Sequence, residues 1–505
     1  MNRGELLEQL DREPFDVLVI GGGITGAGTA LDAAFRGLRV ALVEKDDFAS
    51  GTSSRSSKLI HGGLRYLKGL EFGLVREGLR ERRELERMAP HLVTPLRFVV
   101  PRFGRPHPAI RAGLFAYDAL AAGSGYPRHE RINSGQVREL SAMLRPARGG
   151  LVFWDARTDD ARLVWSAART AQRAGATIVN HAEVVELLRT DGRIAGATVL
   201  DRESGRSIEV TARVVVNATG VWADAVRRLE APGAEVGIRA SRGSHIVFRA
   251  SRLPTTTALL LPTSDRRFVF VIPWEDETVV VGTTDVDYEG PLDDPQPSEP
   301  EIDYLLEVVA SVMGHRVGRN DVVAAFAGLR PLVRSRGRTK DISRRHVVDV
   351  GPGGMVTITG GKLTAWRRMA NDAVNEALRT GGFDYQPVSR THEERLTGAA
   401  FADGVVPALR AVLDELGLDE AHAQRLYHRY GSLAAEVLRL VREDASLGEC
   451  LHPDAPYLRA EAEYAITTEM ARTAEDVLAR RLRLALTTSD GGKAALGWVT
   501  DRLTQ

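Results

Sequence analysis

Three glycines and one glutamate have the spacing of a dinucleotide-binding site. Gly21, Gly23 and Gly26 form the pattern G-x-G-x-x-G directly after a short apolar run, and Glu44 follows about 20 residues later. In such a site the glycines form a tight turn that lets the backbone approach a pyrophosphate, and the acidic side chain accepts hydrogen bonds from a ribose. The pattern therefore indicates binding of NAD or FAD, which this element alone does not distinguish. An ordinary strand–helix–strand unit with a surface glutamate is the alternative.

These residues need a strand–helix–strand unit to position them. Phe15–Ile20 is an apolar run typical of a buried parallel strand, and a helix is predicted to begin near Ile24. The first turn of that helix, which includes Thr25, would offer N–H groups and the positive end of the helix dipole to a phosphate. Arg39–Val43 is predicted to be the second strand, and it delivers Glu44 to the same edge of the sheet.

A short loop rich in hydroxyl groups follows the second strand. It runs from Asp46 to Lys58 and is also basic. Because the loop lies at the cofactor-facing end of the predicted sheet, its hydroxyl and N–H groups would be able to hold phosphate and ribityl oxygens. A solvated surface loop has the same composition; we favour the functional interpretation.

Further strands and helices surround this unit. The sequence predicts a helix over Trp154–Ala174, a strand over Thr177–Val185, and a buried strand over Arg213–Gly220 whose small last residues would approach the dinucleotide. Val236–Asp287 is rich in strands and predicts an antiparallel sheet. A strand over Met355–Thr359 is predicted to lead through paired glycines directly into another helix.

Length and composition limit the class of protein. The chain has 505 residues, enough for two or three domains with their own cores. Its 67 lysines and arginines balance 67 aspartates and glutamates, so no global charge indicates a nucleic-acid partner. The single cysteine, Cys450, excludes an internal disulfide or a cysteine-built metal cluster, and we expect no metal site. Without a signal-like N-terminus or a membrane-length apolar run, we expect a soluble or peripheral cytoplasmic protein.

One segment alternates basic with bulky apolar residues. It lies between Pro95 and Gly125, and its basic residues are Arg97, Arg102, Arg105, His107 and Arg111. Such a segment can lie on an anionic membrane surface. A cap element whose arginines are only solvated is the equal alternative.

Six motifs follow one another along nearly the whole chain: VIGGGITGAG, TSSRSSKLIHGGLRYL, RGSHIV, VGTTD, GLRPL and TGGKLT. A C-terminal stretch, APYLRAEAEYAITTEMARTAEDVLARRLRL, extends them. Together they resemble the FAD-dependent glycerol-3-phosphate dehydrogenase family, whose members are respiratory, quinone-linked enzymes. A resemblance over this much of the chain is far more specific than the glycine fingerprint.

The resemblance implies the α/β fold of glutathione-reductase-like and amino-acid-oxidase-like flavoproteins. A Rossmann-like FAD domain would be discontinuous, at 14–94, 150–235 and 322–380. An antiparallel substrate or cap domain would occupy 95–149 and 236–321, and a helical C-terminal domain 388–505.

The resemblance also implies which residues bind FAD. They are Gly21, Gly23, Ile24, Thr25, Gly26, Glu44, Lys45, Thr52, Ser53, Ser57, Lys58, Leu59, His61, Gly62, Val184, Ala218, Thr219, Gly220, Gly361, Lys362, Leu363 and Thr364. We expect the flavin to be bound noncovalently, because Cys450 lies far in sequence from these motifs.

The implied reaction is oxidation of sn-glycerol 3-phosphate to dihydroxyacetone phosphate, with electrons passed to a membrane quinone. It needs a hydride acceptor, a base for the hydroxyl and cations for the phosphate. The matching residues are Arg65, Tyr66, Arg344 and Thr284 for substrate binding, and His245, Arg330 and Lys362 for catalysis. His245 is favoured over Arg330 as the base, because neutral imidazole accepts a proton near neutral pH while guanidinium hardly does. Taken singly, each arginine could equally be a solvated cation, and His245 a structural histidine.

Two kinds of alternative function stay open from the sequence. An oxygen-using glycerol-3-phosphate oxidase, or a related FAD amine or amino-acid oxidase, would share the fold and produce peroxide. A flavin-binding regulatory subunit would not bleach its flavin when substrate is added. The resemblance further implies a peripheral position on the inner face of the cell membrane, and a homodimer is an additional hypothesis.

Overall fold

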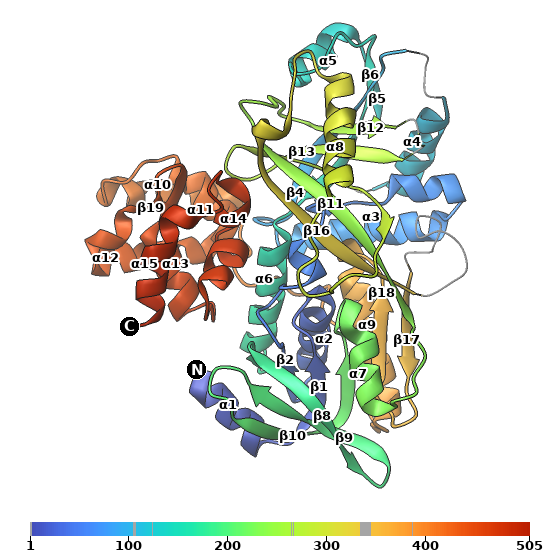
Figure 1. Cartoon of the computed structure of the whole chain (residues 1–505), viewed down its shortest axis with the longest axis vertical. Coiled ribbons are helices and arrows are strands. Elements are labelled where there is room, and N and C mark those ends of the chain that lie inside the picture. The colour runs from blue at the N-terminus through green and yellow to red at the C-terminus, as the bar shows by residue number, and fades with distance from the viewer. Residues whose placement is uncertain are drawn as a thin grey trace.

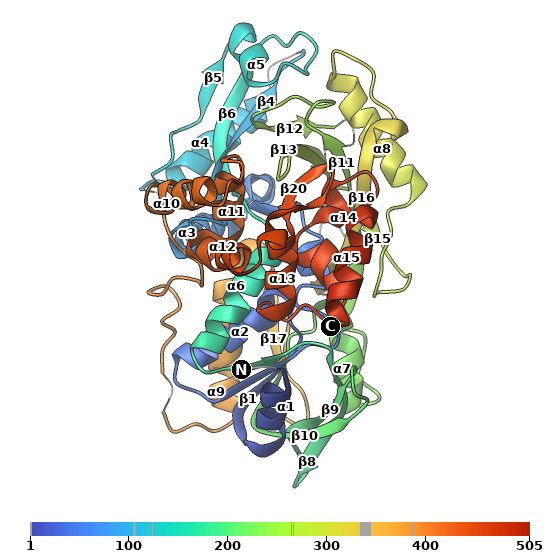
Figure 2. The ribbon, with the colours of Figure 1, turned by 90° about the vertical axis from the view of Figure 1, so that its left-hand side faces the viewer.

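The computed structural model describes residues 3–104, 108–123, 125–263, 265, 267–333, 345–385 and 387–505. The chain forms two large sheets and a helical domain (Figure 1). In that view the mainly parallel sheet lies below the other large sheet, and the helical C-terminal domain projects to one side. Turned by 90°, the C-terminal domain lies in front of helix α6 (Asp160–Arg173) and the middle of the molecule (Figure 2).

The first sheet has eight strands and a parallel centre. Its main order is β17–β18–β10–β1–β2–β7, in which only the β17–β18 pair is antiparallel, while β9 pairs with β10 and β8 pairs with β9. The strands are β1 (Phe15–Ile20), β2 (Val40–Val43), β7 (Thr177–Val179), β8 (Ala182–Thr190), β9 (Arg193–Asp201), β10 (Ser207–Asn217), β17 (His346–Val350) and β18 (Val356–Gly360).

Alternate residues of the central strands fill two different cores. Val17 and Val19 of β1 join the core made with helices α2 (Ile24–Phe35), α6 and α9 (Trp366–Thr380). Leu18 and Ile20 face the opposite core, which helix α1 (Arg3–Arg12) closes together with β8 and β9. Both faces of the parallel strands are therefore buried, which explains their continuous apolar sequence. Helix α7 (Ala223–Glu230) follows β10.

The second sheet has ten strands and carries its own helices. The strands are β3 (Leu59–Ile60), β4 (Thr94–Pro101), β5 (Glu130–Ile132), β6 (Gly150–Arg157), β11 (Ile238–Arg249), β12 (Ala258–Pro262), β13 (Phe268–Pro273), β14 (Thr278–Gly282), β15 (Val286–Asp287) and β16 (Val322–Val333). The helices are α3 (Phe72–Met88), α4 (Pro108–Leu120), α5 (Ser134–Leu140) and α8 (Glu299–Val312). All pairings except β12–β4 are antiparallel, as expected from the alternating pattern.

The C-terminal domain is helical, with one short hairpin. Its elements are α10 (Ala402–Glu415), α11 (His422–Tyr430), α12 (Ala434–Glu443), β19 (Cys450–His452), β20 (Ala455–Leu458), α13 (Arg459–Thr467), a π-helical segment (Asp476–Arg481), α14 (Leu484–Thr487) and α15 (Lys493–Leu503). Two clusters of apolar side chains form its core. None of the helices described is both long and apolar enough to cross a bilayer.

Three local predictions were wrong. Trp154 lies in strand β6, and the helix begins only at Asp160, because residues 150–157 pair with β4. The single strand predicted over Thr177–Val185 is two strands, separated where His181 adopts a positive φ of 50°. The helix expected at the paired glycines starts later, at Trp366.

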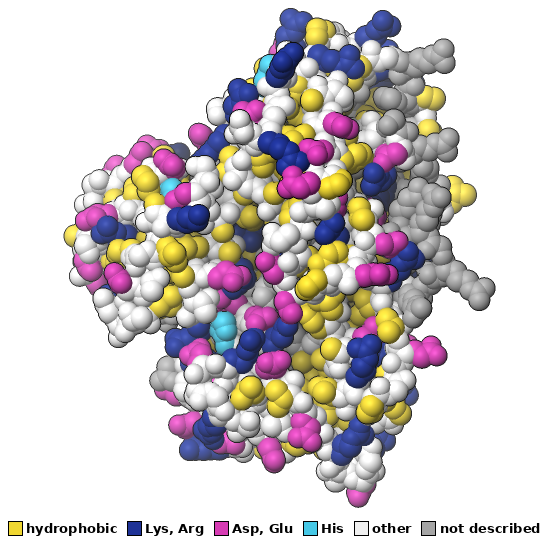
Figure 3. Space-filling view, viewed as in Figure 1, with side chains coloured by type: hydrophobic (Ala, Val, Ile, Leu, Met, Phe, Trp, Pro, Cys, Tyr) yellow, Lys and Arg dark blue, Asp and Glu magenta, His cyan; other side chains and the backbone are white. Residues whose placement is uncertain are grey.

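Two strands belong to a different sheet from the one that the predicted domain boundaries imply. We predicted that 150–157 and 322–333 belong to the cofactor domain, but β6 and β16 pair within the second sheet. Which sheet a strand joins depends on pairing with segments far away in the sequence, which local patterns do not encode. On the face shown in Figure 3, acidic and basic side chains are interspersed, in keeping with their equal numbers.

Candidate active site

The glycine turn brings backbone to backbone at the end of β1. Gly21 has a φ of 108°, and a Cβ there would lie 2.9 Å from the carbonyl oxygen of Ala218. A Cβ on Gly26 would lie 1.7 Å from the carbonyl oxygen of Gly21, so only glycine fits where α2 leaves the turn. No side chain caps Gly23 at the start of α2, while Ser53 Oγ accepts from the Ile24 N–H at 3.0 Å. The remaining first-turn N–H groups, including that of Thr25, have no intrahelical partner and suit a pyrophosphate.

Glu44 lies at the end of β2, beside this turn. Its buried carboxylate accepts hydrogen bonds from the N–H groups of Gly22, at 2.6 Å, and Asp46, at 2.9 Å. Burial raises the pKa of Glu44. Each carboxylate oxygen has two lone pairs, so the group keeps acceptor capacity for ribose hydroxyls. The Ala182 N–H donates to the Glu44 carbonyl, which brings Val184 of β8 into the same neighbourhood.

The end of β10 completes this edge of the sheet. The Ala218 N–H donates to the carbonyl of Ile20, and the Thr219 hydroxyl donates to Asn217 Oδ1 at 2.7 Å. Gly220 follows with a φ of 59°. The predicted small-residue strand end is therefore adjacent to the glycine turn.

A second group of predicted residues surrounds His245. Its Nε2 lies 2.8 Å from Ser57 Oγ, and its ring stacks on Phe326 with 4.8 Å between centroids and 9° between planes. Gly243 leaves room for Arg330, since a Cβ there would lie 2.3 Å from Arg330 Nη2. Arg330 donates to Thr283 Oγ1 at 2.9 Å, and Thr52 donates to the Leu329 carbonyl at 2.5 Å.

A third group of predicted residues follows strand β3 in the chain. Leu59, which comes directly after Lys58, is the first residue of that strand. The Thr364 hydroxyl bonds both the N–H, at 3.1 Å, and the carbonyl of His61, at 3.3 Å. Lys362 Nζ lies 4.9 Å from the centre of the Tyr66 ring and donates to the Leu74 carbonyl, and the Arg65 guanidinium lies 5.2 Å from the same ring. Two cations thus gather at one aromatic ring. Gly361 and Leu363 flank Lys362.

The N–H of Gly62 contacts side chains that the sequence did not indicate. Its N–H points to Tyr117 OH and Asp155 Oδ1, each at 3.0 Å. Arg82 donates to the same carboxylate oxygen at 2.6 Å. A Cβ on Gly62 would lie 2.4 Å from Tyr117 OH, so the glycine is required for this close packing.

Comparisons with known proteins agree with this geometry. Residues 16–367 match the family model "FAD dependent oxidoreductase", and residues 389–505 match "C-terminal domain of alpha-glycerophosphate oxidase". The chain is 41% identical to glycerol-3-phosphate dehydrogenase of Mycobacterium leprae, over 99% of this chain and 86% of that protein. It is 38% identical to the human mitochondrial glycerol-3-phosphate dehydrogenase, over 97% of this chain and 70% of that protein.

The chain belongs to the FAD-dependent glycerol-3-phosphate dehydrogenase family. A structure of the Bacillus halodurans glycerol-3-phosphate dehydrogenase complexed with FAD matches with a TM-score of 0.80 at 29% identity, covering 99% of this chain and 93% of that one. The L-alpha-glycerophosphate oxidase of Mycoplasma pneumoniae, at 20% identity and a TM-score of 0.56, shares the fold. The α/β FAD-binding fold with a helical C-terminal domain is confirmed, and so is FAD as the cofactor.

The residues present fit FAD. The glycine turn and the start of α2 suit its pyrophosphate, and Glu44 suits its adenosine ribose. Ser57 precedes β3 and His61 follows it, and the backbone of His61 bonds Thr364, two residues after Lys362. Bound FAD supplies a hydride acceptor in its isoalloxazine ring.

Desolvation controls the ionisation of three predicted site residues, His61, His245 and Lys362. It lowers the pKa of His61 to about 4 and holds that of His245 well below its usual range, with Arg330 and Lys58 acting in the same direction. Both imidazoles are therefore neutral near pH 7. Desolvation also lowers the pKa of Lys362, although Tyr66 and nearby glutamates oppose the shift.

Two predicted site residues make contacts that the sequence did not indicate, and a third is not described. The Thr284 side chain is buried, and its hydroxyl donates to Glu301 at 2.6 Å, so its carbonyl rather than its hydroxyl meets Arg330. Lys45 lies over the Trp222 ring at 4.5 Å and pairs with Asp293 at 2.5 Å. Arg344 lies outside the described residues.

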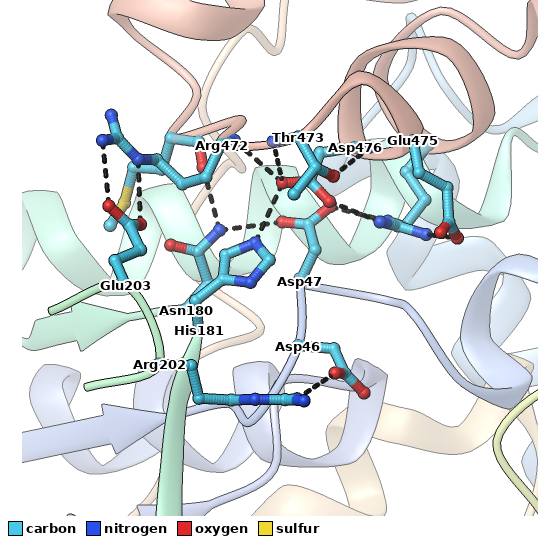
Figure 4. Close-up of polar contacts among 12 residues, drawn as sticks. Asp46, Asp47, Asn180, His181, Arg202, Glu203, Arg472, Thr473, Glu475 and Asp476 are labelled. Carbon is cyan, nitrogen blue, oxygen red and sulfur yellow. Dashed lines mark hydrogen bonds and ion pairs between the residues drawn. The ribbon is translucent and has the colours of Figure 1, made fainter. Parts of the chain in front are cut away.

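The largest group that the sequence did not reveal joins the cofactor domain to the C-terminal domain. Figure 4 shows Asn180 bonded to Asp47 and His181 bonded to Asp476, with Arg472 paired to Glu203 beside them. Asp47 accepts from Arg480 Nε at 2.7 Å and from two nitrogens of Arg481, at 2.7 and 2.8 Å. Asp47 is fully buried, three residues after Glu44. The cofactor loop, residues 46–58, therefore begins beside Glu44 and places Asp47 against arginines of the C-terminal domain.

Proposed function

We propose that this chain oxidises sn-glycerol 3-phosphate to dihydroxyacetone phosphate with FAD and passes the electrons to a membrane quinone. The observation that carries the proposal is the gathering of Arg65 and Lys362 at the Tyr66 ring, beyond an FAD-binding turn. Two cations at one place suit a phosphate dianion. An amino-acid oxidase needs one arginine for a carboxylate and not a set of cations.

The chain's own residues divide the work of this reaction. Arg65 and Lys362 bind and neutralise the phosphate or the negative charge that develops beside it. His245, held neutral by its surroundings, accepts the hydroxyl proton, and Ser57 fixes the direction of its Nε2. Arg330 orients the substrate hydroxyl, because a guanidinium donates hydrogen bonds but does not accept them.

Anaerobic mixing with glycerol 3-phosphate tests the reaction. The flavin absorbance should bleach with substrate and persist with glycerol or an amino acid. His245→Ala should slow the bleaching by about 10²–10⁴-fold, chiefly through kcat, as expected for loss of a general base. A His245→Ala enzyme that reduces its flavin at the native rate would remove His245 from the mechanism.

The electron acceptor needs a separate measurement. After reduction by substrate, the flavin should be reoxidised rapidly by a soluble quinone analogue and slowly by dissolved oxygen. Stoichiometric peroxide in air, with no acceleration by the quinone, would instead identify the oxygen-using oxidase.

An apolar surface supports access to a membrane quinone. Leu70, Phe72 and Phe115 are 72%, 46% and 55% exposed, and the turn Leu64–Gly69 contacts both α3 and α4, which carry or adjoin them. Tyr66 lies in that turn, so the apolar surface adjoins the ring at which Arg65 and Lys362 gather. We propose that this surface docks on the inner face of the cell membrane.

Two of the arginines that suggested docking make contacts within the chain. Arg97 lies over the Trp154 ring and Arg102 donates to the Arg148 carbonyl, whereas Arg111 is exposed beside Phe115. Arg105 and His107 lie outside the described residues. The homodimer stays a prediction.

Liposome co-sedimentation tests the docking surface. Binding to vesicles with anionic lipid should fall when Leu70 and Phe115 are changed to Glu. The matched control is Phe401→Glu, because Phe401 is 53% exposed but lies on the C-terminal domain. Equal binding by native enzyme and the double variant would contradict the proposal.

A further inference from the structure

Asp160 is a fully buried hub between the cofactor loop and the C-terminal domain. Its two carboxylate oxygens each accept from Lys58 Nζ at 2.8 Å, and one also accepts from Ser56, through the N–H at 3.0 Å and the hydroxyl at 2.6 Å. From the C-terminal domain, Arg483 donates to the other oxygen. All the charged members of this hub are less than 2% exposed.

Arg483 spans the boundary with more than one contact. It also donates to Asp159 Oδ1 at 3.2 Å and to the Ser54 carbonyl at 3.4 Å. Its backbone has a φ of 68°, a conformation that a non-glycine residue adopts at a cost and that the surrounding contacts must hold. Lys58, Arg483 and Arg429, which lies 3.7 Å from Asp159 Oδ2, are the cations that face Asp159 and Asp160.

Two paths connect this hub to His245. Ser56 and Lys58, which Asp160 fixes, flank Ser57, whose hydroxyl bonds His245 Nε2. Lys58 Nζ also lies 5.0 Å from the centre of the Phe326 ring, on which His245 stacks. Each path places the imidazole by way of loop 54–58.

We propose that Arg483 is a positioning residue for the oxidation, and that the C-terminal domain acts through it to hold loop 54–58 and thereby the imidazole of His245. The inference rests on the proposed function of His245 as the base. Arg483 contacts two carboxylates, the carbonyls of Ser54 and Ala479 and the Trp274 ring, all within the chain, so its effect on the reaction passes through Asp160 and loop 54–58. A small displacement of a base costs rate steeply, because proton transfer needs hydrogen-bond reach.

Anaerobic flavin reduction in the FAD-loaded enzyme provides the test. Arg483→Ala should lower the rate constant at saturating glycerol 3-phosphate by about 10–100-fold, with KM and FAD content near native. Arg483→Lys, which keeps the charge but not the fork, should lose only several-fold. The matched control is Arg472→Ala, since Arg472 also joins the C-terminal domain to the cofactor domain, through Glu203, but does not touch the hub.

A combined variant separates positioning from general stability and covers the case in which Arg483→Ala fails to fold. If Arg483 acts through loop 54–58, Arg483→Lys should change the rate by less than about twofold in a Ser57→Ala, Phe326→Leu background, because both paths to His245 are then cut. An equal loss in the native and Ser57→Ala, Phe326→Leu backgrounds overturns the proposal, as does an equal loss in Arg472→Ala. Native enzyme that does not bleach with glycerol 3-phosphate refutes the proposed function instead.

Discussion

Two groups of cationic side chains have opposite surroundings. One group is Arg65 and Lys362 at the Tyr66 ring, and the other is the set of arginines at the boundary with the C-terminal domain. Arg480, Arg481 and Arg483 have side chains at most 8% exposed, and each pairs with a carboxylate. Arg65 is exposed and Lys362 half-buried, and within the described ranges neither has a carboxylate at ion-pair distance. Burial with complete pairing marks the structural set. Accessible cations without a carboxylate partner form the set that suits a ligand anion.

The largest effect should come from breaking the structural set. Asp47→Ala leaves Arg480 and Arg481 buried without their shared carboxylate, which should lower the free energy of unfolding by about 3–5 kcal/mol. Urea unfolding followed by circular dichroism measures this. Asp293→Ala is the control, because its pair with Lys45 is exposed. A loss as small as that of the control would contradict the distinction.

Removing a cleft cation should affect the reaction and not the fold. Lys362→Met should lower kcat/KM for glycerol 3-phosphate by about 10²-fold, equivalent to about 2.7 kcal/mol, through lost stabilisation of negative charge. The melting temperature should not fall, because desolvation already opposes the ammonium charge there. Stopped-flow reduction and thermal melting test both halves, and a destabilised variant with native kinetics would reverse the assignment.

Two histidines extend the comparison to pH. Burial lowers the pKa of His91 to about 3, so below pH ~6.5 the unfolded chain binds a proton that the folded chain does not. This one group should therefore lower the free energy of unfolding by up to about 1.4 kcal/mol per pH unit, or about 2 kcal/mol from pH 6.5 to 5, and His91→Gln should reduce the slope of the whole protein by that share. Unfolding titrations across this range in both proteins provide the measurement.

His181 should show the opposite sign. Burial opposes its charge, but the hydrogen bond and attraction of Asp476 outweigh burial and raise the pKa of His181. The contribution of His181 to the free energy of unfolding is therefore complete below pH ~6.5, and it is lost as the pH rises through the pKa of His181 in the folded protein. His181→Asn should remove that alkaline-side decline. If the contributions of His91 and His181 to the free energy of unfolding changed with pH in the same direction, pairing with a carboxylate would not determine that direction.

The smallest effect belongs to the exposed pair at the same boundary. Arg472→Ala breaks two contacts to Glu203, of 2.9 and 3.0 Å, between side chains that are 39% and 33% exposed. Solvent screens such pairs, so the loss should be below about 1 kcal/mol and should shrink further in high salt. Urea unfolding at two salt concentrations checks this.

The part of the fold that local pattern determines could be predicted from the sequence. β1, the glycine turn, α2 and β2 follow within 30 residues, and their apolar runs and glycines specify them without outside contacts. Trp154 was misassigned because β6 takes its conformation from pairing with β4, more than 50 residues away. His245, Arg330 and Ser57 could be brought together only through the family motifs, since spacing alone does not join them.

The boundary network could not be predicted for the same reason. Asp47 and Arg481 are 434 positions apart, and a run such as Arg480-Arg481 resembles a solvated helix face. Their burial depends on how two domains dock. Asp155, Arg82 and Tyr117, which brace Gly62, likewise have no recognisable spacing.

The separation of Asp160 from Arg483 in the sequence has a consequence for biosynthesis. Asp47 leaves the ribosome 434 codons before Arg481, and Asp160 leaves it 323 codons before Arg483, so the nascent Rossmann-like domain must wait with Asp47 lacking its arginines and Asp160 paired to Lys58 alone. We expect flavin capture to be a post-translational event that follows release of the last helices. Ribosome-stalled chains ending before residue 470 should therefore remain colourless, and premature termination should yield an apoprotein that cellular proteases can clear.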